Sequence, residues 1–264
     1  LSCWQYIMEK FSCKFHEALL IVSNDFNIKK SIITLEPRVI AANDEFKLKM
    51  ANIPKENREV KLEFVKQSWN LTDFEFWNQY EIDFETLDLY NIISAKQTYL
   101  IRGNHRVTFD WKKDKPRYGY LFKDSSKAYS PYENKLGKWM NDGNSIEGWD
   151  QLDEKSDLII ITKALKEVLI YHLMDINAIA LPSETYNLSE ELVNELKLRF
   201  NNIILNLDGD EQGIKSTNKI VDKYGFKYFY IDEPEKDLGD YIKRYDLELA
   251  KLMINNKLKN INES

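Results

Sequence analysis

Asp208 and Asp210, separated by one glycine, are the residues of this chain best suited to catalytic chemistry. They follow the apolar run at residues 203–207 and precede Gly213, so a buried strand would deliver both carboxylates to the edge of a sheet. Carboxylates held this close repel each other unless a cation neutralises them, and their hard oxygen atoms suit Mg²⁺ or Mn²⁺. The alternative is a solvated Asp-Gly turn, which is a common end to a strand.

The C-terminal half of the sequence carries the elements that would position these aspartates. Strands are predicted at residues 157–162, 176–181, 203–207 and 227–231, alternating with helices predicted at 164–174, 188–200, 211–224, 237–244 and 247–258. This order is typical of an α/β domain with a parallel sheet, in which ligands bind at the carboxyl edge. Carboxylates follow three of the four strands, so we expect Glu184, Asp208, Asp210, Asp237 and Asp240 to gather there.

Residues 101–138 differ in charge from the rest of the chain. The net charge of the whole chain is −6, whereas this stretch holds ten Lys and Arg residues against four Asp and Glu residues. Strand-like aromatic runs alternate with the basic residues, and this mixture suits single-stranded nucleic acid. A sheet with a buried aromatic face and a solvated lysine face explains the same pattern. The candidates for contacts with nucleic-acid phosphates are Arg102, Arg106, Lys112, Lys113, Arg117 and Lys138.

The residues before the α/β domain divide into a helical segment and a small α+β subdomain. Apolar side chains at residues 4–25 recur at helical spacing, and residues 28–57 form an irregular, proline-containing linker. A strand is predicted at 59–67, followed by a helix at 71–80 capped by Thr72 or Asp73 and a helix at 83–90 that begins with Asp83. Further strands are predicted within 97–132, including residues 106–111 and 118–122. We therefore predict a helical segment and linker at 1–45, a basic, aromatic-rich subdomain at 46–150 and the α/β domain at 151–264.

Membrane insertion and zinc binding are not expected. No apolar run is long enough to span a bilayer. Cys3 and Cys13 are the two cysteines, and together with His16 they fall short of the four ligands of a structural zinc site. Because the chain has only two cysteines, a reducing compartment is favoured, and the expected location is the cytoplasm.

These motifs resemble the Toprim domain, the catalytic fold shared by bacterial-type primases, topoisomerases and some nucleases. The Asp-x-Asp-x-x-Gly pattern within residues 205–213 is similar to the family's acidic motif, and Lys236-Asp237-Leu238-Gly239-Asp240 is similar to an element of DnaG-type primases. Residues 118–122 and Lys138-Trp139-Met140-Asn141 resemble the β-rich subdomain that precedes Toprim in primases. The N-terminal helical stretch looks like the end of a primase zinc-binding domain without its cysteine ribbon. In its general character the sequence is most similar to the primases of bacteriophages.

One position departs from the family pattern. Toprim domains carry a Glu-Gly pair at the end of the first strand, where this chain has Lys163 and Ala164. A lysine cation cannot bind Mg²⁺, but it can bind a triphosphate or the charge that develops in phosphoryl transfer. Glu184, at the end of the next strand, is our hypothesis for the missing carboxylate. Its alternative is a solvated loop glutamate.

The resemblance implies a DNA primase core that makes short RNA primers on single-stranded DNA with Mg²⁺ or Mn²⁺. It assigns residues at the strand ends to three roles: Asp208, Asp210, Asp237 and Asp240 as metal ligands, Asp208, Asp210, Lys163 and Glu184 as catalytic residues, and Lys163 and Lys138 as nucleotide-binding residues. The expected partners are the DNA template, ribonucleoside triphosphates and a separate replicative helicase, since the sequence has no P-loop motif. For a phage protein the location would be the host cytoplasm.

Two other functions use the same residues. A Toprim nuclease would use the aspartates to hydrolyse a phosphodiester, although the primase-like segment at residues 118–141 argues against it. The other is a non-catalytic module that binds single-stranded nucleic acid, in which Lys163 would mark the loss of catalytic activity. The retention of Asp208, Asp210, Asp237 and Asp240 argues against that alternative.

Overall fold

The computed structural model describes residues 59–134, 136–183, 186–231 and 234–263, together with Tyr6 and Lys10. The chain divides into two compact units, Leu1–Ala41 and Ala42–Ser264, and the fold described here is that of the second unit. The helices predicted at residues 4–25, the linker at 28–57 and the residues Cys3, Cys13 and His16 lie outside the described residues, except for Tyr6 and Lys10, which are helical. The domain boundaries at residues 45 and 150 stay predictions.

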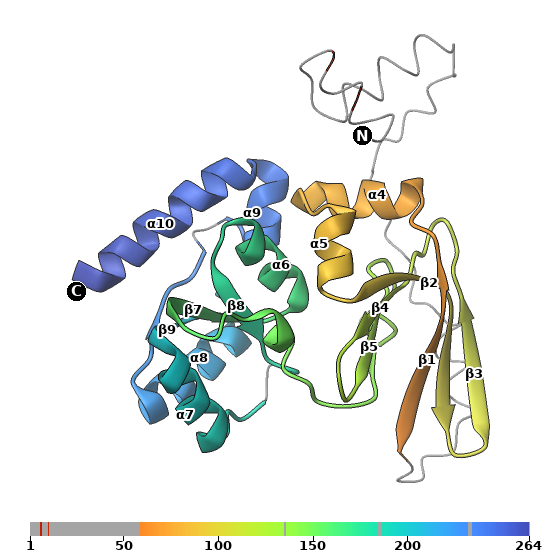
Figure 1. Cartoon of the computed structure of the whole chain (residues 1–264), viewed down its shortest axis with the longest axis horizontal. Helices are drawn as coiled ribbons and strands as arrows, with labels where there is room; N and C mark the ends of the chain where they lie inside the picture. Colours follow the sequence, from red (N-terminus) through yellow and green to blue (C-terminus); the bar gives the residue numbers. More distant parts are fainter. Residues whose placement is uncertain are drawn as a thin grey trace. The chain divides into compact units, whose positions relative to one another are not determined.

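The first part of this unit is an antiparallel sheet, on the right of Figure 1. Its long strand β2 (Ile92–Arg102) pairs along one edge with β1 (Val60–Gln67). Along its other edge β2 pairs first with β4 (Tyr118–Leu121) and then with β3 (His105–Asp110), and the sheet continues through β5 (Ser126–Tyr129) to β6 (Trp139–Asn141). The strands predicted at residues 59–67, 106–111 and 118–122 are confirmed.

Helices α4 (Leu71–Trp77) and α5 (Phe84–Leu89) cover this sheet, with the 3₁₀ turn η1 (Asn78–Tyr80) between them. Asp83 caps α5 as expected, because its side chain accepts a hydrogen bond of 2.7 Å from the backbone N–H of Thr86. The prediction that Thr72 or Asp73 caps α4 is wrong. Asn70 is the cap, and Asp73 completes a reciprocal capping box with it.

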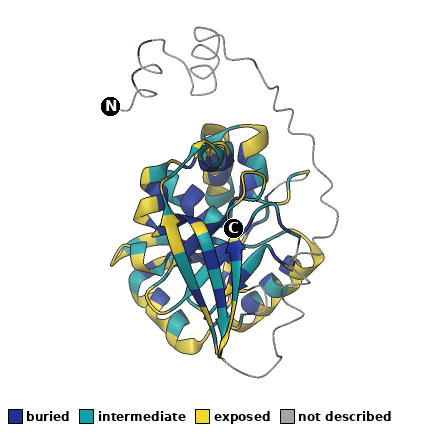
Figure 2. Cartoon of the chain, turned by 90° about the vertical axis from the view of Figure 1, so that its right-hand side faces the viewer, coloured by how far each residue is buried: buried dark blue, intermediate teal, exposed yellow. Residues whose placement is uncertain are grey.

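The aromatic residues of this part are mostly core. Trp77, Tyr118 and Tyr120 are fully buried, and Phe76 and Tyr129 nearly so. Figure 2 shows buried residues, in dark blue, toward the middle of the fold and exposed residues, in yellow, toward its outside. The pattern that suggested base stacking between residues 101 and 138 is therefore explained largely by a buried aromatic face, the alternative that the sequence also allowed.

Trp77→Ala is expected to lower the free energy of unfolding by about 3–5 kcal/mol, because it leaves a large cavity at a fully buried position. Chemical denaturation followed by circular dichroism measures this change. Leu71→Ala, on the exposed side of the same helix, is the matched control and should change stability by about 0.5 kcal/mol or less. Equal losses for the two variants would contradict the packing assigned to Trp77.

The second part is a four-stranded parallel sheet in the order β10-β9-β7-β8, on the left of Figure 1. Its strands are β7 (Ser156–Thr162), β8 (Asn177–Ala180), β9 (Phe200–Asn206) and β10 (Lys227–Tyr228). Its helices are α6 (Leu165–Leu173), α7 (Glu190–Arg199), α8 (Glu211–Tyr224), α9 (Leu238–Arg244) and α10 (Leu247–Glu263). Each predicted strand and helix of residues 157–258 is present, so the α/β fold class is confirmed.

Alternate residues of the central strand β7 enter two hydrophobic cores. Ile159 and Ile161 pack into the core that contains Leu196 of α7, whereas Ile160 packs into the core that contains Val168 of α6. All three isoleucines are fully buried, as expected for a parallel strand covered on both faces. The helices therefore cover both faces of the sheet and leave its carboxyl edge for polar residues.

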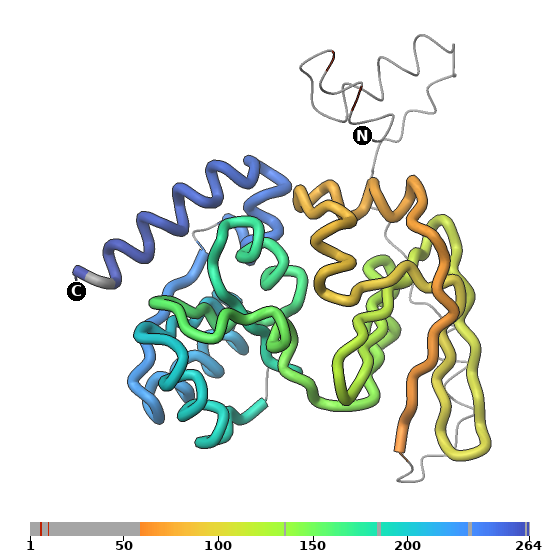
Figure 3. The backbone as a smooth tube through the Cα atoms, viewed as in Figure 1, coloured from red at the N-terminus to blue at the C-terminus, as the bar shows by residue number. Residues whose placement is uncertain are grey.

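One of these cores extends without interruption from the parallel sheet to the antiparallel part. It joins Ile160, Val168 and Ile242 to Tyr80 and Trp77. Figure 3 shows the C-terminal segment, in blue, returning beside the helices near residue 80, and the Leu247 N–H donates a 3.1 Å hydrogen bond to Glu81 Oε1. In the described part of the chain, no helix is long and apolar enough to cross a membrane.

Candidate active site

The carboxyl ends of β7 and β9 bring Lys163 and Asp208 together. Thr162 of β7 lies opposite Asn206 of β9, so the residues that follow these strands leave the sheet side by side. Asp237 comes from the segment after β10 and caps α9, where its Oδ1 accepts a 2.7 Å hydrogen bond from the Asp240 N–H. Three separate connections thus supply one site, as expected at the carboxyl edge of an open α/β sheet.

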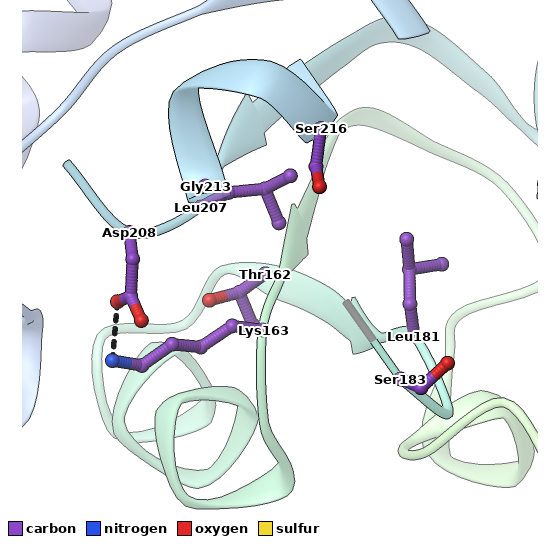
Figure 4. A pocket seen from close by; sticks show the side chains of 8 residues that line it. All are labelled: Thr162, Lys163, Leu181, Ser183, Leu207, Asp208, Gly213 and Ser216. Atoms are coloured by element: carbon purple, nitrogen blue, oxygen red, sulfur yellow. Dashed lines mark hydrogen bonds and ion pairs between the residues drawn. The ribbon is translucent and has the colours of Figure 1, made fainter. Parts of the chain in front are cut away.

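Lys163 contacts three carboxylates at this edge. Its Nζ atom donates hydrogen bonds to Asp208 Oδ1 and, over 2.7 Å, to Asp237 Oδ2. A third carboxylate oxygen, Glu167 Oε1, lies 3.7 Å from the same Nζ. Figure 4 shows the extended Lys163 side chain reaching Asp208 from the facing loop. The small pocket beside this pair is lined by Thr162, Lys163, Leu181, Ser183, Leu207, Asp208, Gly213 and Ser216.

Glu167, which is not among the site residues predicted from the sequence, completes an acidic cluster. One carboxylate oxygen each from Glu167, Asp208 and Asp237 lies within 4.8 Å of the others. The Glu167 residue is 2% exposed, and its Oε2 accepts a hydrogen bond from the Thr162 hydroxyl. Its Oε1 is buried and has no hydrogen-bond donor among the described residues. Its position four residues after Lys163, in the first turn of the helix, was the available sequence signal.

The electrostatics of the cluster follow from burial and from the lysines around it. Burial raises the pKa of Glu167 to about 7, against the opposing effect of Lys163. Burial also acts to raise the pKa of Asp237, but Lys166, Lys163 and two hydrogen bonds outweigh it and lower that pKa to about 2. The pKa of Lys163 is raised, because its three carboxylate neighbours outweigh burial. Lys163 and Asp237 are therefore ionised at neutral pH.

Asp210 and Asp240, the two other predicted ligands, lie outside this cluster. Asp210 is exposed and caps α8, with its Oδ1 accepting a 2.8 Å hydrogen bond from the Gly213 N–H. Asp240 lies on α9 with its Oδ1 3.8 Å from Lys243 Nζ. Gly213 is required at its position because a Cβ atom there would collide with the backbone carbonyl of Asp208. Glu184 lies outside the described residues, so its predicted role is not tested.

Glu147 connects the first sheet to the helix that carries Glu167. The N-cap residue of α6 is Ala164, whose side chain has no hydrogen-bonding group. The fully buried Glu147 takes its place, because its Oε2 accepts a 2.7 Å hydrogen bond from the Leu165 N–H. The other oxygen accepts a 2.5 Å hydrogen bond from Lys127 of β5. A buried carboxylate from outside the parallel sheet thus fixes the start of α6.

A group of lysines lies beside the acidic cluster, around the ring of Tyr80. The Nζ atoms of Lys166 and Lys243 lie 4.2 Å and 4.8 Å from the centre of this ring. Burial lowers the pKa of Lys138, and the ammonium groups of Lys166, Lys163 and Lys243 lower it further, so Lys138 lies within electrostatic range of both lysines. We call Lys138, Lys166 and Lys243 the lysine group. Repulsion within it would be relieved by a bound anion.

The remaining predicted nucleic-acid residues differ in exposure. Arg106 is exposed and stacks on the ring of Tyr99 at 3.5 Å, and Lys112 and Lys113 are exposed after the end of β3. Arg102 is half-buried at the end of β2. Arg117 is 5% exposed and bonds to Ser130 and Glu133 over 2.7 Å and 3.2 Å. Arg117 therefore holds Ser130 and Glu133 in the interior, where its side chain is not exposed for the predicted contact with a phosphate.

Comparison with known proteins agrees with this geometry. Residues 161–242 match the Toprim-like family model. Over this segment the chain is similar to the Toprim-like family. The matched segment contains Lys163, Glu167, Asp208 and Asp237, so the acidic cluster lies wholly within it. A search of curated proteins by sequence found no match.

Solved primase structures share the fold of the longer unit. The Aquifex aeolicus primase, comprising zinc-binding and RNA polymerase domains, is similar with a TM-score of 0.54 and 14% identity, over 97% of this chain and 70% of that one. The E. coli primase catalytic core has a TM-score of 0.51 and 12% identity, over 69% of this chain and 72% of that one. A DnaG catalytic core gives 0.53 and 12%, over 72% and 74%. At these identities the likeness establishes a DnaG-type primase core fold.

Proposed function

We infer that this chain is the catalytic core of a DNA primase that synthesises short RNA primers on a single-stranded DNA template. The observation that carries this inference is the meeting of Glu167, Asp208 and Asp237 at the sheet edge of the segment that matches the Toprim-like family, next to the lysine group. The primase-core fold supports the same conclusion.

The three carboxylates fit a divalent cation such as Mg²⁺ or Mn²⁺. They offer hard oxygen donors within 4.8 Å of one another, and Glu167 Oε1 is a buried oxygen that lacks a hydrogen-bond donor within the described residues. Asp208, Asp237 and Glu167 would hold the ion, and Asp240 and Asp210 are candidates for contacts with its water molecules. When bound, the ion would neutralise phosphate charge and activate the attacking hydroxyl.

The residues of this chain position the reactants for in-line transfer. The 3′-hydroxyl oxygen of one nucleotide forms a bond to the α-phosphorus of the next and releases its proton to solvent water. The bond from that phosphorus to the oxygen that bridges it to the β-phosphate breaks, releasing pyrophosphate. The lysine group holds the triphosphate through charge and hydrogen bonds. Lys163, bonded to Asp208 and Asp237, holds these two carboxylates in place and favours their ionised form. Arg102, Arg106, Lys112 and Lys113 contact the template backbone.

A single reaction tests this function. The chain is incubated with single-stranded templates, ribonucleoside triphosphates and Mg²⁺ or Mn²⁺, and the products of wild type and Asp208→Ala are compared. Template-dependent oligoribonucleotides that Asp208→Ala does not make would support the primase. Metal-dependent degradation of the template would instead identify a nuclease, and DNA binding without either activity would identify a non-catalytic module.

Binding of a single-stranded oligonucleotide is expected to weaken steeply as the salt concentration rises. Replacing Arg102, Arg106, Lys112 and Lys113 by glutamine should reduce the slope of log affinity against log salt by about 3, since each phosphate contact on a single strand contributes about 0.7. Fluorescence anisotropy at several salt concentrations measures the slope. A variant in which the exposed Lys155 and Lys259 are replaced by glutamine should keep it. An unchanged slope in the fourfold variant would remove these residues from the template site.

A further inference from the structure

Lys163 occupies the centre of the acidic cluster rather than its edge. Its Nζ donates hydrogen bonds to Asp208 and Asp237 and lies 3.7 Å from Glu167, so one ammonium group faces all three carboxylates. The Lys163 side chain is 20% exposed and lines the same small pocket as Leu181 and Leu207. Lys163 is therefore held at the position where cations are attracted most strongly.

The charges of the cluster determine how many further cations it can balance. Three carboxylates with one ammonium group carry a charge of −2 when all are ionised, which matches one divalent ion. A second ion bound to Asp208 or Asp237 would lie next to the ammonium, because Lys163 already bonds to one oxygen of each of these carboxylates. Ions in two-metal centres lie about 4 Å apart, so the ammonium would strongly repel one of them.

We propose that Lys163 takes the place of one divalent ion in this centre, so that the protein binds one Mg²⁺ or Mn²⁺ ion at the cluster instead of two. Glu167 Oε1 is an oxygen atom available to that single ion, because it is buried and no described donor bonds to it. The catalytic meaning of this arrangement rests on the proposed primase function. The number of bound ions does not depend on that function, because it is measured without nucleotide or template.

The test is a Mn²⁺ titration of the metal-free chain, with free Mn²⁺ quantified by electron paramagnetic resonance. Wild type should bind one ion. Lys163→Glu, which replaces the ammonium by a carboxylate, should bind two, and Lys163→Met should bind its first ion at least about tenfold more tightly than wild type. Lys215→Met is the matched control, because Lys215 is an exposed lysine that pairs with Glu211 on the surface of α8, and it should behave like wild type.

Two results would overturn the proposal: two ions or none in wild type, or no additional ion in Lys163→Glu together with unchanged affinity in Lys163→Met. Thermal melting of each variant, followed by circular dichroism, identifies any variant that is unfolded. If one of the two Lys163 variants is unfolded, the other still tests the proposal. Primer synthesis measured on the same samples is a separate readout. Failure of primer synthesis with one bound ion would overturn the primase assignment and leave the ion count intact.

Discussion

Asp237→Asn is expected to reduce primer synthesis by about 10²- to 10³-fold, the loss typical of removing one preorganised electrostatic group from an active site. Asparagine has nearly the same shape and retains an oxygen that can accept the Asp240 N–H, so the cap of α9 is kept. What is lost is the negative charge that Lys163 contacts at 2.7 Å and that Lys166 also stabilises. The rate is measured as incorporation of labelled ribonucleotides on a single-stranded template.

Asp222→Asn is the matched control for this substitution, because Asp222 is an exposed residue of α8 outside the acidic cluster. It should retain the wild-type rate. Mn²⁺ binding gives a second readout, in which Asp237→Asn should bind the ion more weakly while Asp222→Asn does not. A rate for Asp237→Asn within about a factor of three of wild type would exclude Asp237 from the catalytic centre.

Replacing Lys166 or Lys243 by methionine is expected to raise the KM for ribonucleoside triphosphates by about 10- to 100-fold for each lysine. This range corresponds to one charge-assisted hydrogen bond of about 1.5–3 kcal/mol. Methionine retains an unbranched stem that can still pack on the ring of Tyr80 but removes the ammonium group. Steady-state kinetics at saturating template separates KM from kcat.

The affinity for template DNA distinguishes nucleotide binding from a general electrostatic effect. Lys166→Met and Lys243→Met should leave oligonucleotide affinity within about twofold of wild type, whereas a general loss of positive charge would weaken DNA and nucleotide binding together. Lys215→Met again serves as an exposed lysine control. Unchanged KM values in both variants would show that the triphosphate binds elsewhere.

The positions of the strand ends could be predicted from the sequence because two independent patterns agree there. The apolar run before Asp208 defines a buried strand, and the alternation with helices requires that strand to be parallel to the one before Lys163. Lys163, Asp208 and Asp237 therefore share one edge, as expected. Lys163 contacts carboxylates there, a partner that the spacing alone did not indicate.

Glu167 could not be predicted in the same way, because it lies inside a helix and not at a strand end. A charged residue in a helical pattern normally faces solvent, whereas this one is 2% exposed and hydrogen-bonded to Thr162. The burial of Arg117 could not be predicted for the same reason, since this basic residue packs against Glu133, which lies 16 residues further along the chain. Burial of a charge depends on partners distant in sequence, which a local pattern does not contain.

The continuous core that joins Tyr80 and Trp77 to Ile160, Val168 and Ile242 limits how this protein can be divided. A fragment that starts at residue 151 would lose the aromatic half of that core and expose the apolar sides of α6 and α9 to water. We therefore expect residues 59–263 to unfold in a single cooperative transition rather than domain by domain. We expect that the segment similar to the Toprim-like family cannot be exchanged as a separate module, and that chimaeras must retain the antiparallel sheet with it.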